Sequence, residues 1–108
     1  MRWMETIKVQ SAAGKERTTE HELTVLAREV RNNPDRQGLR EAAVSIHATV
    51  PGCFALRLSW DTDDPQPGGS LLGTSLAQSL KVFGLVDHSV WIEASKKEGG
   101  EKNVQQKK

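Results

Sequence analysis

The feature that most constrains the fold lies near the middle of the chain, where residues 41–60 alternate twice between apolar and polar side chains. The segment reads EAAVSIHATVPGCFALRLSW. Alternation with a period of two is typical of strands that are buried on one face only. Pro51 and Gly52 interrupt the alternation and favour a turn. The segment therefore predicts a β-hairpin.

The positions of the apolar residues also predict how the two arms pair. A two-residue loop made of Pro51 and Gly52 would place every apolar side chain opposite a polar one. A slip of one residue turns a whole strand over, so burial favours a matched register with a loop of three or five residues. The pairs predicted on this basis are Val44 with Trp60, Ile46 with Leu58, Ala48 with Leu56 and, on the opposite face, His47 with Arg57.

Two further segments, residues 2–10 and 85–94, alternate in the same way and predict the first and last strands. In the last strand His88 falls on the apolar side, which favours a hydrogen-bonded histidine in the core. Trp91 falls on the other side.

Helical spacing of apolar residues follows Thr19 and again Ser70. Thr19 and Glu22 fit a capping box at the start of the first helix, and Pro34 favours its end. Ser70 is the expected N-cap of the second helix, and Gly84 is the residue expected just beyond its end.

The order β-α-β-β-α-β predicts an α+β, ferredoxin-like fold, in which a four-stranded antiparallel sheet carries two helices on one face. A length of 108 residues fits one domain, which we place at residues 1–95. Residues 96–108 have no apolar periodicity, and their Lys, Glu, Gly and Gln content predicts a disordered tail.

Composition argues against several classes of protein. The formal net charge of the chain is +1. The tail holds five Lys and two Glu, a net charge of +3, so the remainder of the chain has a net charge of −2. A nearly neutral body argues against a nucleic-acid surface, which needs clustered cations. The single cysteine, Cys53, allows no intramolecular disulfide. No apolar run suggests a signal peptide or a membrane span, so we expect a cytoplasmic protein.

The candidate site is the sheet face that the helices leave uncovered. His47 is the residue there that could act as an acid or base near neutral pH, and it is the candidate catalytic residue. Arg57, Trp91, Ser45 and Ser89 are the candidate substrate-binding residues. The competing interpretation of the same face is a dimer interface, where His47 and Arg57 form a cross-strand polar pair.

The sequence offers little for a metal or an organic cofactor, and we expect neither. The three histidines have no paired spacing of the kind that zinc sites use. Asp61, Asp63 and Asp64 lack the glycine and the final Glu of a calcium loop. Gly68-Gly69-Ser70 before a helix could hold an anion, but without a Lys-Ser/Thr continuation the better interpretation is a linker.

The chain resembles the dimeric α/β-barrel superfamily, and within it the antibiotic-biosynthesis monooxygenase-like group, over residues 5–94. The resemblance rests on the element order, on a strand that ends at Trp60 before an acidic loop and a helix, and on the final strand FGLVDHSVWIE. It implies a homodimer in which two sheets pack face to face around a cavity. Pro51-Gly52-Cys53 departs from the group, where a similar tripeptide often precedes the second strand.

The resemblance further implies an enzyme that oxidises a small aromatic or quinol-type molecule in this cavity without a metal or organic cofactor. The alternative is a non-catalytic dimeric module for ligand binding or assembly. An RNA-binding sheet is disfavoured, because such sheets stack bases on exposed aromatic residues, whereas Phe54 and Trp60 fall on the helix side here.

Overall fold

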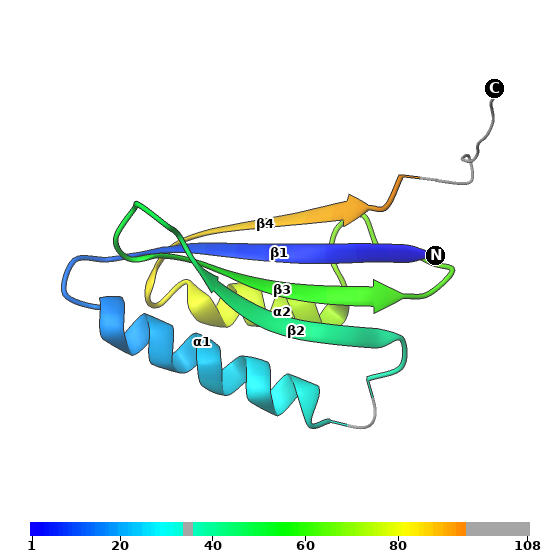
Figure 1. The fold of residues 1–108 in the computed structure, drawn as a ribbon, viewed down its shortest axis with the longest axis horizontal. Coiled ribbons are helices and arrows are strands. Elements are labelled where there is room, and N and C mark those ends of the chain that lie inside the picture. The colour runs from blue at the N-terminus through cyan, green and yellow to red at the C-terminus, as the bar shows by residue number, and fades with distance from the viewer. Residues whose placement is uncertain (34–35, 95–108) are drawn as a thin grey trace.

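The computed structural model describes residues 1–33 and 36–94, and its elements follow the predicted order (Figure 1). The predicted disordered tail, residues 96–108, lies outside the described residues. The elements are β1 (Arg2–Ser11), α1 (Glu16–Arg31), β2 (Leu39–Ile46), β3 (Cys53–Asp61), α2 (Leu71–Leu80) and β4 (Gly84–Ile92).

The four strands form one antiparallel sheet in the order β2-β3-β1-β4. Both helices lie on the same face of this sheet in Figure 1, with α1 against β2 and β3 and α2 against β1 and β4. This topology confirms the predicted ferredoxin-like α+β fold.

The core lies between the helices and the covered face of the sheet. Each helix contributes a buried stripe at helical spacing, and the strands contribute alternate residues, as amphipathic elements must when one side is buried. Trp3 and Trp60, paired across β1 and β3, stack with ring centroids 5.5 Å apart. The other large buried side chains include Ile7, Val9, Leu23, Phe54, Leu56, Leu58 and Leu80.

The hairpin forms, but its predicted register is wrong. Ala42 pairs with Leu58, Val44 with Leu56 and Ile46 with Phe54, so β2 is displaced by four residues from the predicted pairing. Because four is an even number, every side chain keeps its predicted face. The alternation in the sequence specified the face of each residue, whereas the alignment along the strand depended on the turn.

The turn explains the displacement. The backbone N–H of His47 donates to the carbonyl of Cys53 at 2.9 Å, which leaves residues 48–52 as a loop of five residues. This length is one of the two predicted, but the loop is centred two residues earlier. Gly52, with a φ of 76°, occupies the last position of the loop rather than its middle, where its left-handed backbone lets the chain enter β3.

Helix α1 begins earlier than predicted and without the capping box. The helix starts at Glu16 after Lys15, and no side chain caps it. Thr19 lies one turn inside, fully buried, and its hydroxyl donates to the carbonyl of Lys15 at 2.8 Å. The predicted end before Pro34 is close to the observed one, because α1 ends at Arg31.

Helix α2 begins as predicted and ends differently. The Ser70 hydroxyl accepts a hydrogen bond from the Gly73 N–H at 2.9 Å and so acts as the N-cap. Gly84 does not follow the helix directly, since it is the first residue of β4. A side chain at Gly84 would collide with the backbone of Gln10 on β1, so close approach of two strands explains this glycine.

Candidate functional site

The sheet face opposite the helices is the candidate site, and we call it the outer face. Strand register places on it a central set of eleven side chains, mostly small or of moderate polarity. They are Met4, Thr6 and Lys8 of β1, Ala43 and Ser45 of β2, Ala55, Arg57 and Ser59 of β3, and Asp87, Ser89 and Trp91 of β4.

Arg57 lies at the centre of the outer face. Its Cα partners are Thr6 on one side and Ala43 on the other. The residue is half-buried, and within residues 1–33 and 36–94 its side chain makes no hydrogen bond or ion pair. The centre of this face therefore holds a positive charge whose five N–H donors are free for a partner from outside the chain.

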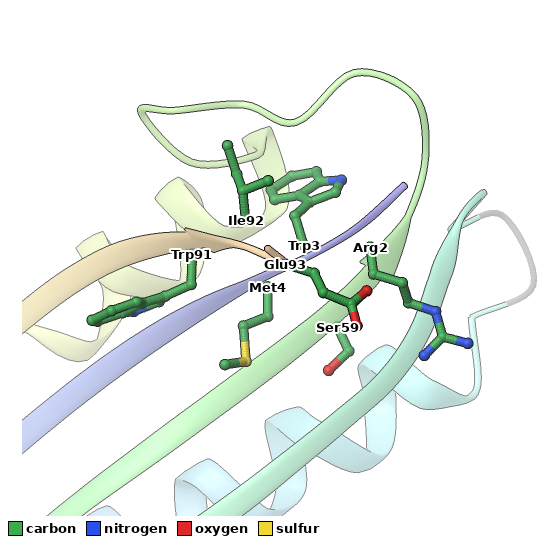
Figure 2. Close-up of a pocket in the computed structure, with 7 residues that line it drawn as sticks. All are labelled: Arg2, Trp3, Met4, Ser59, Trp91, Ile92 and Glu93. Carbon is green, nitrogen blue, oxygen red and sulfur yellow. The ribbon is translucent and has the colours of Figure 1, made fainter. Parts of the chain in front are cut away.

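Trp91 is the large exposed aromatic residue of the outer face. Its side chain is 59% exposed, and its indole N–H donates to the Ser89 hydroxyl at 2.9 Å, which directs the ring back along β4. Trp91 and Met4 both line two open hollows, of about 340 and 390 Å³. Figure 2 shows the first hollow, where Trp91, Met4 and Ser59 lie on one side of the strands and Trp3 and Ile92 on the other.

His47 does not lie opposite Arg57, because the displaced register puts Ala43 there. His47 follows the end of β2, where its Nδ1 accepts hydrogen bonds from the N–H groups of Thr49 and Val50 at 3.1 and 3.0 Å. The ring thus closes the hairpin loop. Neither hollow beside Trp91 is lined by His47. Along the strands His47 is offset from Trp91 by six residues, which is roughly 20 Å at about 3.3 Å per residue.

The two predicted serines lie at different places on the outer face. Ser89 supports Trp91 and is opposite Thr6 on β1. Ser45 is opposite Ala55 on the far edge of the sheet. The structure thus places Arg57 of β3 near Ser89 and Trp91 of β4, with β1 between them, while Ser45 and His47 lie toward the hairpin end.

A buried carboxylate beneath α2 is the polar feature that sequence reasoning missed. Glu5 has no exposed surface, and its two oxygens are bonded by the Trp60 indole N–H at 2.8 Å, the Ser70 hydroxyl at 2.5 Å and the Ser70 N–H at 3.0 Å. Alternation in β1 indicated the inner face for Glu5, but nothing in the sequence showed which donors would meet it.

His88 completes the environment of Glu5. Its Nε2 lies 2.8 Å from Oε1 of Glu5, and its side chain is mostly buried. This confirms the prediction of a hydrogen-bonded core histidine. A hydrogen atom is all that fits at Gly73, where a side chain would meet the Glu5 carboxyl group. The groups before α2 that could have held an outside anion, the N–H and hydroxyl of Ser70, thus donate to the chain's own Glu5.

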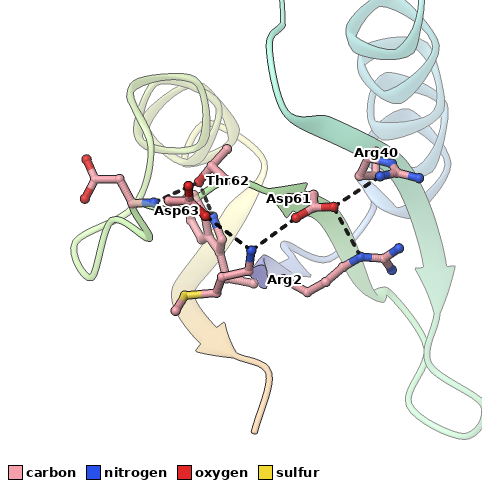
Figure 3. A network of polar contacts seen from close by, with 8 residues as sticks. Arg2, Arg40, Asp61, Thr62 and Asp63 are labelled. Atoms are coloured by element: carbon pink, nitrogen blue, oxygen red, sulfur yellow. Dashed lines mark hydrogen bonds and ion pairs between the residues drawn. The ribbon is translucent and has the colours of Figure 1, made fainter. Parts of the chain in front are cut away.

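Two of the aspartates at and after the end of β3 take part in ion pairs. Asp61 approaches Arg40 at 3.2 Å, the Met1 amino group at 3.3 Å and Arg2 at 3.8 Å (Figure 3). Asp63 also approaches the Met1 amino group, at 3.7 Å. These groups are well exposed, so each pair contributes little to stability. Among the described residues, no cluster of histidine, cysteine, aspartate or glutamate could hold a metal ion.

Comparison with known proteins identifies the architecture. No protein-family model matches the chain, and no curated protein matches it in sequence. Crystal structures of three proteins, each called a "putative antibiotic biosynthesis monooxygenase", superpose on it. The protein from Deinococcus radiodurans has a TM-score of 0.63 at 18% identity and covers 96% of this chain and 99% of its own. The chain has the fold of these proteins.

Two further structures support the same conclusion. The Chloroflexus aurantiacus protein has a TM-score of 0.54 at 12% identity, covering 94% of this chain and 98% of its own. The Bordetella bronchiseptica protein has a TM-score of 0.52 at 16% identity, covering 82% and 94%. The predicted resemblance is thereby confirmed at the level of the fold. Neither α1 nor α2 is long and apolar enough to cross a lipid bilayer.

Proposed function

We propose that the chain forms a homodimer through the outer face and that the space between the two faces takes a small aromatic or quinol-type molecule. We further propose that this molecule is oxidised without a metal or an organic cofactor. The observation that carries the proposal is the exposed Trp91, which together with Met4 borders two hollows on a sheet face that no helix covers. The fold shared with the monooxygenase-like structures supports it.

The outer-face residues have distinct roles in this proposal. Trp91 and Met4 contact the ring of the bound molecule, because both present apolar, polarizable surface to the hollows. Arg57 and the hydroxyls of Ser45 and Ser89 contact its polar groups. His47 is the proposed proton-transfer group, and because it lies roughly 20 Å from Trp91 within one chain, it would act on a molecule held mainly by the second copy. Nε2 is the nitrogen left for that task, because Nδ1 already accepts hydrogen bonds from the hairpin loop.

The proposed reaction balances without a further reductant. A phenol reacts with O₂ to give a quinone and water, so the ring supplies the electrons, one oxygen atom enters the ring and the other leaves as water. The outer face would accelerate such a reaction by holding the ring and excluding solvent.

A second candidate function is a non-catalytic dimeric binding module. The placement of His47 favours it, because no histidine lines the hollows beside Trp91. In that case the same dimer would form and the molecule would bind without being consumed.

Sedimentation and an oxygen electrode together test the proposal. We expect a species of twice the chain mass, and oxygen uptake with a panel of phenols and hydroquinones that Trp91→Ala and His47→Ala each reduce at least tenfold. Glu20→Ala, an exposed change on α1, is the matched control and should leave both readouts unchanged. A monomer would contradict the dimer. A dimer that binds the phenols without oxygen uptake would select the binding module.

A further inference from the structure

Arg57 differs from Arg2 and Arg40 of the sheet in having no counter-charge among residues 1–33 and 36–94. Arg2 and Arg40 both approach Asp61. Lys8 lies directly across from Asp87 on the neighbouring strand. Arg57 lies between Thr6 and Ala43 and has no acidic residue as a direct cross-strand partner.

The surroundings of Arg57 leave its guanidinium group accessible from outside. Its neighbours along β3 on the outer face are Ala55 and Ser59, and those across the sheet are Thr6 and Ala43, all of them small. Arginine presents its N–H donors in a planar fork that matches the two oxygens of a carboxylate. A half-buried guanidinium without such a partner retains unused binding capacity, because partial burial already limits its contact with water.

The distance between Arg57 and Trp91 sets the size of a molecule that could contact both. One strand separates them, and they lie two residues apart along the strands, since Arg57 is level with Ser89. Strand geometry gives about 12 Å between the two Cα atoms. Both side chains are long and Met4 lies between their strands, so a ring with an acidic group a few bonds away would reach from one to the other.

We propose that the molecule bound at the outer face is an aromatic acid, whose anionic group pairs with Arg57 while its ring lies against Trp91 and Met4. The inference rests on the proposed function, because it assigns the charge of the molecule that the same face takes. The competing occupant of Arg57 is an acidic side chain of a second copy, and the experiment below separates the two.

Calorimetric titration with 3-(4-hydroxyphenyl)propanoate and with its methyl ester tests the inference. The two probes share the ring and differ in the negative charge. We expect the acid to bind about tenfold or more tightly than the ester, because a charge-assisted hydrogen bond is roughly twice as strong as a neutral one. Arg57→Gln should abolish the preference, whereas Arg57→Lys should keep part of it because the charge remains but the fork is lost.

Arg17→Gln is the matched control, because it removes one exposed arginine charge from α1 on the other side of the sheet. It should leave the preference for the acid intact. Equal binding of acid and ester, or a preference that survives in Arg57→Gln, would overturn the inference and leave the proposed aromatic site standing. Failure of both probes to bind would overturn both. A dimer that falls apart on Arg57→Gln would also overturn the inference, since the anion would then belong to the second copy.

Discussion

The two faces of the sheet are built from the same four strands, yet they treat polar groups in opposite ways. The inner face buries Glu5 and surrounds its carboxylate with donors from Trp60, Ser70 and His88. The outer face holds the charge of Arg57 without a partner in the described chain and leaves Trp91 exposed. The carboxyl group of the inner face is satisfied by donors from the same chain, whereas the guanidinium of the outer face has no partner among the described residues.

This difference indicates that the inner face contributes to the stability of the fold and that the outer face is the surface suited to binding. A buried charge costs several kcal/mol unless hydrogen bonds satisfy it, so the donors around Glu5 are required for folding. Unused donors and exposed aromatic surface contribute nothing to folding of one chain, and they are the features that recognise a partner. Variants of the inner face should therefore change the free energy of unfolding much more than variants of the outer face.

The largest effect is expected for Glu5→Ala. Removing the carboxylate leaves the Trp60 indole N–H, the Ser70 N–H and hydroxyl, and His88 without their acceptor in the core. We expect a loss of about 3–5 kcal/mol in the free energy of unfolding, as for other broken buried networks. Urea denaturation followed by circular dichroism measures it.

Two further variants sharpen the test of Glu5. Glu5→Gln keeps the shape but turns one acceptor into a donor, and should cost about 1–3 kcal/mol. Glu41→Gln, on the exposed edge strand β2, should change stability by less than about 0.5 kcal/mol. Equal effects at Glu5 and Glu41 would contradict the structural role assigned to the buried carboxylate.

A smaller effect, confined to one side of α2, is expected from truncating its leucines. Leu80 is fully buried, whereas Leu71 is 93% exposed. Leu80→Ala should destabilise the fold by about 2–5 kcal/mol through lost burial and a cavity. Leu71→Ala should stay within about 0.5 kcal/mol, because this side chain contacts mainly water. Thermal unfolding of the two variants side by side checks the direction in which α2 faces.

The smallest effect is expected at the hairpin loop. His47→Ala removes the acceptor for the N–H groups of Thr49 and Val50, and because these groups are exposed we expect a loss of about 1 kcal/mol or less. His47→Asn retains a short polar acceptor and should recover part of it. Amide hydrogen exchange at Thr49 and Val50 reports the change directly, and unchanged exchange in His47→Ala would show that the ring does not close the loop.

Much of the fold could be predicted from the sequence, because alternation determines the face of a strand residue. The six elements, the Ser70 cap and the inward direction of His88 all followed from period and local chemistry. The pairing of β2 with β3 could not be predicted, since registers four residues apart direct the same apolar side chains to the same face of the sheet. The position of the five-residue loop decided between them, and the His47 side chain accepts two hydrogen bonds within that loop.

The candidate site was predictable in part for a related reason. Arg57, Ser89 and Trp91 fall on the outer face by alternation alone. Met4 was not singled out, because its place beside Trp91 depends on the pairing of β1 with β4. The Glu5 network joins residues from β1, β3, β4 and the start of α2, so no local pattern could have shown it.

The three tryptophans divide the intrinsic fluorescence of the protein into two parts. Trp3 and Trp60 are stacked and buried, and their N–H groups donate to Thr62 and Glu5, so a dissolved quencher such as acrylamide should barely reach them. Trp91 alone is open to water. Its emission should be readily quenched in a free chain and shielded once anything covers the outer face, so the protein carries its own optical reporter of whether that surface is occupied.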